Sequence, residues 1–199
     1  DLNDHMDGLA SENIACRNYT CFIGAGSYDH FIPSIVPYLV SRSEFATAYT
    51  PYQPEVSQGT LQGIYEFQTM ITELLGMDIA TASHYDCGTA LAECALISLR
   101  KNRKADKFAV SSLVHPSHRQ IIETYLKPTE YEMVEIPHTQ DGLTDLKALE
   151  AMEGIAGVAV QSPNFLGHIE NLAGFRKAAD DKKILLTVSF TEALAYGLL

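Results

Sequence analysis

Apolar residues recur at mostly helical spacing between residues 60 and 75. They are Leu61, Ile64, Phe67, Ile71 and Leu74. This spacing predicts an amphipathic helix with one apolar face. Ser57 is a plausible N-cap for that helix, and Gly76 supplies the stop signal.

Beyond this helix, β-type and helical segments alternate to the end of the chain. Apolar, β-rich runs predict strands or extended segments at residues 78–83, 108–113, 131–136, 155–160 and 184–190. Helical spacing predicts helices at 89–100, 116–126, 145–152 and 171–180. Pro116 opens one of these helices, and Thr144 is expected to cap the next. The alternation indicates βαβ crossovers, and therefore an α/β fold with a mostly parallel sheet and helices on both faces.

Composition narrows the class of protein. The chain of 199 residues is 46% hydrophobic and 20% charged, which is typical of a globular protein and not of a disordered one. A formal charge of −11 argues against nucleic acid and anionic membranes as partners. No apolar run approaches the roughly 18 residues that would span a bilayer.

The cysteine pattern bears on the compartment. None of the pairs among Cys16, Cys21, Cys87 and Cys94 has the CxxC spacing of zinc or redox sites. Reduced, partly buried thiols are expected, and with them a cytoplasmic location.

Polar residues gather in the predicted loops at 83–88, 114–119 and 161–170. In a parallel sheet, ligands bind beyond the carboxyl ends of the strands, so these loops form a candidate site. Asp86, Gly88 and Thr89 make a turn at a helix N-terminus, where free backbone N–H groups suit a phosphate. Asp86 would repel a phosphate, however, and an ordinary helix cap explains the same residues.

Other motifs carry weaker signals. His115 and His118 have a spacing that could serve a metal, but a metal site needs three or four ligands and no acidic partner is evident. A thiol nucleophile at Cys87, near His84 or His115, lacks any geometric support. Gly24-Ala25-Gly26-Ser27 lacks the third glycine of a dinucleotide-binding loop, so a tight turn is favoured.

The segment 49–59 combines stiffness with polar and aromatic side chains, as binding loops on rigid scaffolds do. Two prolines stiffen it. Its candidate active-site residues are Tyr49, Thr50, Tyr52, Gln53, Glu55 and Ser57. A purely structural extended arm is the alternative.

The same segment closely resembles the glycine decarboxylase P-protein family, in the subunit 1 form of the split enzyme. Further matching stretches are Arg42-Ser43-Glu44-Phe45, Glu66-Phe67-Gln68-Thr69-Met70, residues 22–30, residues 82–90 and residues 161–170 with Pro163-Asn164-Phe165. The resemblance implies the type I fold of pyridoxal-phosphate enzymes. It also implies decarboxylation of glycine, with transfer of the aminomethyl group to the lipoyl arm of H-protein.

The resemblance further implies an α2β2 assembly in which subunit 2 carries the Schiff-base lysine. No catalytic residue is then expected in this chain, and the turn of Asp86, Gly88 and Thr89 is a vestige of a phosphate site. The lysines are Lys101, Lys104, Lys107, Lys127, Lys147, Lys177, Lys182 and Lys183. None falls in a loop beyond the carboxyl end of a predicted strand. Pyridoxal phosphate is expected mainly on the partner, and no metal is expected.

Against the family pattern, residues 1–56 are expected to form an N-terminal arm with partner-contacting loops, and residues 57–199 an incomplete α/β large domain. The chain starts inside the usual N-terminal region and ends before the small C-terminal domain, so exposed apolar surface is expected. Cys87 replaces a small residue, and Glu192-Ala193 stands nearest to the usual acid–proline pair. Two alternatives remain: a non-catalytic interaction module that stabilises its partner, and a self-sufficient enzyme whose lysine lies beyond Leu199.

Overall fold

The computed structural model describes residues 1–24 and 28–198, so most of the Gly24–Ser27 turn lies outside the described residues. Gly24 itself has a left-handed backbone with φ 67°. The chain forms two compact units, Asp1–Ala46 and Thr47–Leu199, each described here by itself. The expected division at residue 56 lies further along the chain, so the segment 49–56 belongs by its contacts to the second unit.

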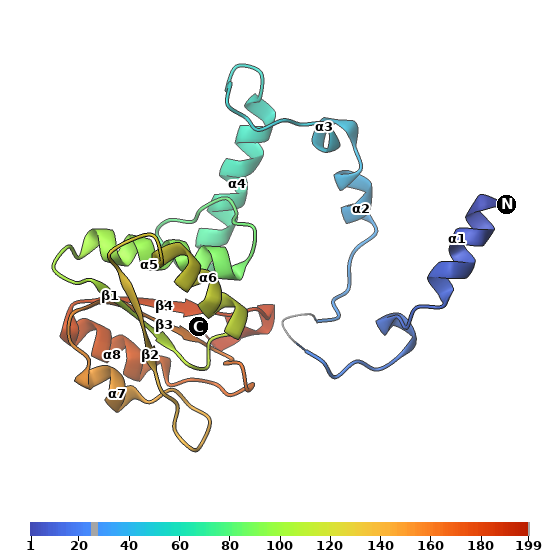
Figure 1. Cartoon of the computed structure of the whole chain (residues 1–199). Coiled ribbons are helices and arrows are strands. Elements are labelled where there is room, and N and C mark those ends of the chain that lie inside the picture. Colours follow the sequence, from blue (N-terminus) through green and yellow to red (C-terminus); the bar gives the residue numbers. More distant parts are fainter. Residues whose placement is uncertain (25–27, 199) are drawn as a thin grey trace. The chain divides into compact units, whose positions relative to one another are not determined.

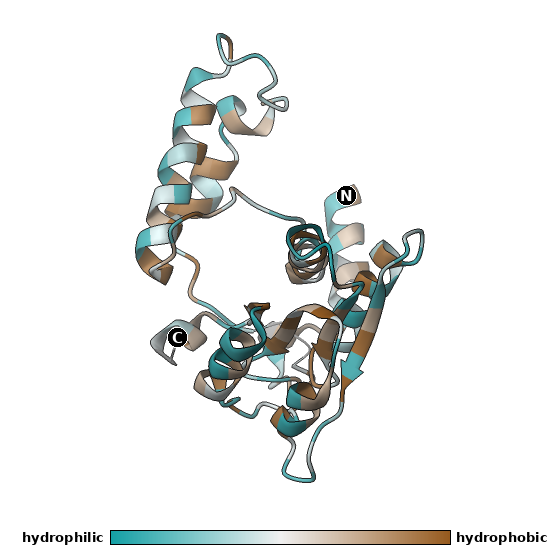
Figure 2. Cartoon of the chain, turned by 90° about the vertical axis from the view of Figure 1, so that its left-hand side faces the viewer, coloured by the Kyte–Doolittle hydropathy of each residue, from teal (hydrophilic) through white to brown (hydrophobic). Residues whose placement is uncertain are grey.

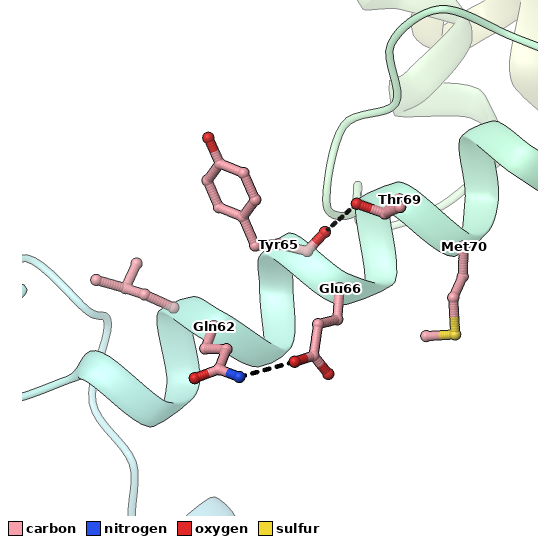
Figure 3. Close-up of a pocket in the computed structure, with 6 residues that line it drawn as sticks. Gln62, Tyr65, Glu66, Thr69 and Met70 are labelled. Atoms are coloured by element: carbon pink, nitrogen blue, oxygen red, sulfur yellow. Dashed lines mark hydrogen bonds between the residues drawn. The ribbon is translucent and has the colours of Figure 1, made fainter.

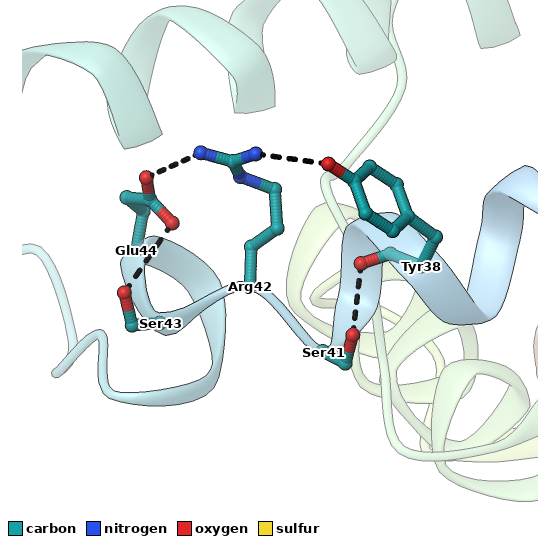
Figure 4. Close-up of polar contacts among 5 residues, drawn as sticks. All are labelled: Tyr38, Ser41, Arg42, Ser43 and Glu44. Atoms are coloured by element: carbon teal, nitrogen blue, oxygen red, sulfur yellow. Dashed lines mark hydrogen bonds and ion pairs between the residues drawn. The ribbon is translucent and has the colours of Figure 1, made fainter.

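The first unit is a string of short helices in which none of the described residues is buried. Its elements are α1 (Leu2–Ser11), the 3-10 turn η1 (Cys16–Asn18), α2 (Ile35–Val40) and α3 (Ser43–Ala46). None of its three α-helices has a buried residue. Arg42 joins α2 to α3 through an ion pair with Glu44 at 2.7 Å and a hydrogen bond to the Tyr38 hydroxyl at 3.4 Å (Figure 4). Such exposed pairs contribute little to stability, so this unit has few contacts of its own that stabilise it.

The second unit holds a four-stranded, all-parallel sheet in the order β2-β1-β3-β4 (Figure 1). The strands are β1 (Lys107–Ser111), β2 (Glu132–Ile136), β3 (Ile155–Gln161) and β4 (Leu185–Ser189). The helices are α4 (Gln58–Leu75), α5 (Cys87–Lys101), α6 (Pro116–Leu126), α7 (Leu146–Ala151) and α8 (Leu172–Lys182), followed by the 3-10 helix η2 (Ala193–Leu198). The predicted α/β class with a parallel sheet is confirmed.

Helices cover both faces of the sheet. Successive residues of β1 point to opposite faces, as the period of a strand requires. Phe108 and Val110 are fully buried in the core beneath α5 and α6, whereas Ala109 is buried in the core beneath α7 and α8. A side chain at Gly157 of β3 would lie 2.7 Å from the Ser98 hydroxyl, so only glycine allows α5 to approach this closely.

Hydrophobic and hydrophilic residues interleave along the helices (Figure 2), and the pattern located most elements correctly. Helix α4 follows Ser57, which occupies the N-cap position without a side-chain capping hydrogen bond. The helix stops at Gly76 as predicted, and this residue has a left-handed backbone with φ 62°.

Two expectations at the element level are wrong. The buried strand or extended segment expected at residues 78–83 is neither paired in the described sheet nor buried, and Ile79 is 82% exposed. The cap of α7 is Asp145, whose carboxylate accepts the N–H groups of Lys147 and Ala148. Thr144 is instead buried and bonded elsewhere.

The cysteines follow the prediction only in part. All four are free thiols, and Cys87 and Cys94 are half-buried, whereas Cys16 and Cys21 are exposed, like nearly all described residues of their unit. Within residues 1–24 and 28–198, no helix has both the length and the apolar character needed to cross a membrane.

Candidate functional site

Three loops meet at the carboxyl ends of the parallel strands, where β1 ends at Ser111 and β3 at Gln161. This end of the sheet is called the carboxyl edge. The first turn of α5 contacts α6, since a side chain at Gly88 would lie 3.2 Å from His118 Cδ2. The His115 ring, at the start of α6, meets the Phe165 ring edge-on at 5.1 Å between centroids. The sequence therefore located these three loops correctly as neighbours, although residues 78–83 form no strand before the first of them.

The turn that begins α5 is occupied by its own carboxylate. Asp86 Oδ1 accepts the Thr89 N–H at 2.7 Å, and Thr89 Oγ1 accepts the Asp86 N–H at 3.2 Å, which makes a reciprocal capping box. The Thr89 N–H is the main reason that the pKa of Asp86 lies below its usual value. An ionised carboxylate at this helix N-terminus would compete with and repel a phosphate. That disfavours anion binding by this turn.

His115 is held in one orientation at the start of α6. Its Nδ1 accepts the Ser117 N–H at 3.2 Å and lies 2.6 Å from the Ser117 hydroxyl. A backbone N–H can only donate, so the neutral ring carries its proton on Nε2. The His115 N–H in turn donates to Gln161 Oε1 at 3.0 Å, which fixes the start of α6 to the end of β3.

His118 stacks against His115 with the ring centroids 4.8 Å apart. Its Nδ1 is buried and has no hydrogen-bond partner among the described residues. Burial lowers the pKa of His118, the nearby His115 lowers it further, and Asp86 partly opposes both effects. The site therefore favours a neutral His118 imidazole.

This depressed pKa should be visible in the pH dependence of stability. The folded-state pKa of His118 lies below the unfolded value of about 6.5. Its contribution to the free energy of unfolding is therefore fully present above that pH. It is lost as the pH falls through the folded pKa. In full-length protein, His118→Gln should flatten the decline of melting temperature between about pH 7 and 5. His5→Gln, on the exposed helix α1, is the control, and equal slopes for parent and His118→Gln would contradict the assignment.

The thiols of this unit are unsuited to nucleophilic chemistry. Burial raises the pKa of Cys87, and the neighbouring Asp86 raises it further. Burial likewise raises the pKa of Cys94. Both side chains therefore stay protonated near neutral pH, whereas the thiolate is the reactive form. Over the described ranges, no three His, Cys, Asp or Glu side chains converge as a metal site.

A buried polar network lies beneath the carboxyl edge, and sequence reasoning missed it. Its members are Ser111, Thr144, Asn164 and Glu170, each at most 5% exposed. Thr144 Oγ1 donates to Glu170 Oε1 at 2.8 Å, and Asn164 Nδ2 donates to the same oxygen at 2.8 Å. Asn164 and Glu170 stood in a loop already singled out, but nothing in their spacing signalled that they would be buried.

No residue of the candidate loop at 49–57 is buried. Tyr49 and Tyr52 are 82% and 77% exposed, and their rings meet edge-on at 6.2 Å. Its backbone hydrogen bonds are local, such as Val56 N–H to the Gln53 carbonyl at 3.1 Å. Its polar and aromatic side chains are thus available to another surface. An active-site role for Tyr49, Thr50, Tyr52, Gln53, Glu55 and Ser57 stays a prediction.

Helix α4 also offers an open surface. Residues Leu61, Gln62, Tyr65, Glu66, Thr69 and Met70 line a shallow groove of about 660 Å³ (Figure 3). All six belong to α4, so the groove has one wall and is no enclosed ligand site. The helix has no buried residue, and Met70 and Leu74 are about 60% exposed. The groove is far better suited to contact with another polypeptide than to catalysis.

The eight lysines lie away from the carboxyl edge. Six lie where helices end or strands begin, on the side of the sheet where the amino ends of the strands lie: Lys101, Lys104, Lys107, Lys127, Lys182 and Lys183. Lys147 and Lys177 are exposed on α7 and α8. None lies in the three loops that build the site.

A parallel sheet with helices on both faces, whose polar loops gather at the carboxyl ends of the strands, defines a protein of the α/β class, in which that end of the strands is the usual place for a ligand. Residues 1–199 match the family model described as glycine cleavage system P-protein. The chain belongs to that family.

Relatives agree over the whole chain. A protein of Desulfotalea psychrophila named probable glycine dehydrogenase (decarboxylating) subunit 1 is 52% identical over 198 residues. Its namesake in Geobacillus kaustophilus is 50% identical over 201 residues. Each match covers 100% of this chain and 44% of the relative, so the chain spans less than half the length of these relatives.

Solved structures agree as well. The crystal structure of glycine decarboxylase (P-protein) of the glycine cleavage system, in inhibitor-bound form, superposes with a TM-score of 0.87 at 41% identity. It covers 100% of this chain and 44% of that chain. A NifS-like protein shares the fold alone, with a TM-score of 0.57 at 12% identity over 76% of this chain and 43% of that chain.

Proposed function

We propose that this chain is part of subunit 1 of a split glycine decarboxylase and contributes loops to an active site completed by its partner. The observation that carries the proposal is the match of the whole chain to part of proteins named probable glycine dehydrogenase (decarboxylating) subunit 1. The proposed reaction decarboxylates glycine and passes the aminomethyl group to the lipoyl arm of H-protein. The proposed partner is subunit 2, in an α2β2 assembly in the cytoplasm.

We propose that the cofactor is held outside residues 1–199, mainly by the partner. Pyridoxal phosphate needs a lysine for covalent attachment and an anion site for its phosphate. The three carboxyl-edge loops contain no lysine, and the α5 turn already has Asp86 at the helix N-terminus. The residues present therefore do not fit as the principal cofactor site. Pyridoxal phosphate in the assembled enzyme is proposed from the glycine cleavage system P-protein family to which the chain belongs.

The role proposed for this chain is recognition and exclusion of water. The segment 49–57 offers flat aromatic rings together with polar groups, which suit a lipoyl arm and an amino-acid substrate. Closing such a loop over a site removes water from reactive groups. The exposed apolar side chains of α4 supply surface for contact with the partner.

The loop can be tested in assembled enzyme built from full-length subunits. Tyr52→Phe and Glu55→Gln should each lower glycine–bicarbonate exchange without preventing assembly. Each variant should lose about 1–3 kcal/mol of transition-state stabilisation, which lowers the exchange rate roughly fivefold to 150-fold. This is the cost of one hydrogen bond left unmade at a buried site.

Tyr125→Phe on α6 and Glu150→Gln on α7 are matched controls that should turn over like the parent. If the two loop variants also assemble and turn over normally, the loop is scaffold. The alternative of a non-catalytic subunit that only stabilises its partner would then be the better account.

A further inference from the structure

Glu170 is a buried carboxylate held by neutral donors. It is 5% exposed, and in the described part of the chain no cationic side chain forms an ion pair with it. The Thr144 N–H lies 3.2 Å from both carboxylate oxygens, and the Thr144 hydroxyl and the Asn164 amide each donate to Oε1 at 2.8 Å. Burying a carboxylate is costly unless donors converge on it, so this arrangement fixes the donors in place.

The direction of each hydrogen bond follows from the carboxylate. The single hydroxyl proton of Thr144 goes to Glu170, so the Ser111 hydroxyl donates to Thr144 Oγ1 at 2.7 Å. Ser111 Oγ then accepts the Leu113 N–H at 3.0 Å. One carboxylate thereby ties together the segments that follow β1 and β2.

Asn164 extends the network to the segment that follows β3. Its Oδ1 accepts the N–H groups of Leu166 at 3.0 Å and His168 at 3.1 Å. Its Nδ2 donates to the Gly142 carbonyl at 2.9 Å as well as to Glu170. All four hydrogen-bonding positions of this amide are used, so the turn 164–168 has one conformation.

That turn delivers Phe165 to His115. The Phe165 N–H donates to the Leu113 carbonyl at 2.9 Å, and its ring meets the His115 ring at 5.1 Å with an interplanar angle of 88°. Phe165 is 48% exposed, so burial alone does not fix its ring. The backbone of the turn, held by Asn164 and Glu170, sets the position from which the Phe165 side chain reaches His115.

We propose that Glu170, acting through Asn164, is a positioning residue that holds Phe165 against the His115 imidazole at the carboxyl edge. The geometric part of the proposal stands alone, whereas its effect on turnover rests on the proposed function. Glu170 itself touches no reacting group. Its replacement should move the His115 ring relative to Phe165 without unfolding the protein.

The test is the NMR resonance of the His115 Cε1–H group in full-length subunit 1. In Glu170→Gln, the amide nitrogen confronts the donors of Thr144 or Asn164, so the turn should loosen. The His115 resonance should then move toward its position in Phe165→Leu, which lacks the ring current of the aromatic neighbour. Thr144→Val, which removes one hydroxyl, is a milder variant should Glu170→Gln fail to fold. The exposed Glu150→Gln on α7 is the control and should leave the resonance in place.

A purely structural role would lower the melting temperature and leave the His115 resonance of the folded protein unchanged. An unmoved resonance in folded Glu170→Gln, or in Thr144→Val if that is the variant that folds, overturns the proposal whatever the turnover. In the assembled enzyme, Glu170→Gln should reduce exchange kcat about tenfold, as small misplacements near a reacting centre do. A moved resonance with unchanged turnover supports the positioning and counts against a catalytic part for this edge of the sheet.

Discussion

When full-length subunit 1 is reduced with borohydride in the presence of pyridoxal phosphate, none of the eight lysines in residues 1–199 should be labelled stoichiometrically. The reason is geometric, because these lysines stand at the opposite edge of the sheet or on exposed helix surfaces. Lys182, near the start of β4, donates to the Met152 carbonyl at 2.8 Å. In the assembled enzyme, one pyridoxyl group per active site should be found on the partner.

Peptide mapping by mass spectrometry would decide the labelling experiment. Scattered label at low occupancy is expected, since exposed amines such as Lys147 and Lys177 react slowly with any aldehyde. One dominant, fully occupied lysine within residues 101–183 would contradict the proposed division of labour. A dominant site in subunit 1 beyond residue 199 would favour the self-sufficient enzyme considered above.

Much of the fold was predictable because local pattern and tertiary packing agree. The helices around Leu91 and Ile122 and the strands around Phe108 and Val158 carry their buried residues at the periods that define each element. The failures have local causes. Residues 78–83 are β-rich yet find no strand to pair with, and a strand without a ladder is not stable. Thr144 and Asp145 are adjacent capping residues, and packing decided which of them caps α7.

The candidate site was predictable only as a set of loops. The rule that parallel strands present ligands at their carboxyl ends brought His115, His118 and Phe165 together. Two of the hydrogen bonds beneath them join residues far apart in the sequence: Thr144 and Glu170 are 26 positions apart, and Ser111 and Thr144 are 33 positions apart. No periodic pattern encodes such pairs. The loop at 49–57 illustrates the reverse case, because its composition points to binding while its exposure leaves the occupant to be found.

We propose that neither subunit catalyses exchange without the other, and a reconstitution assay tests this most directly. Glycine–bicarbonate exchange would be measured with full-length subunit 1 alone, subunit 2 alone and an equimolar mixture, each with pyridoxal phosphate and lipoyl H-protein. Removing a half of a shared site removes positioning, recognition and water exclusion together, so the loss should be far larger than for any single side chain. We predict exchange in the mixture and none above background for either subunit alone. Full exchange by subunit 1 without its partner, or by subunit 2 without subunit 1, would contradict the account.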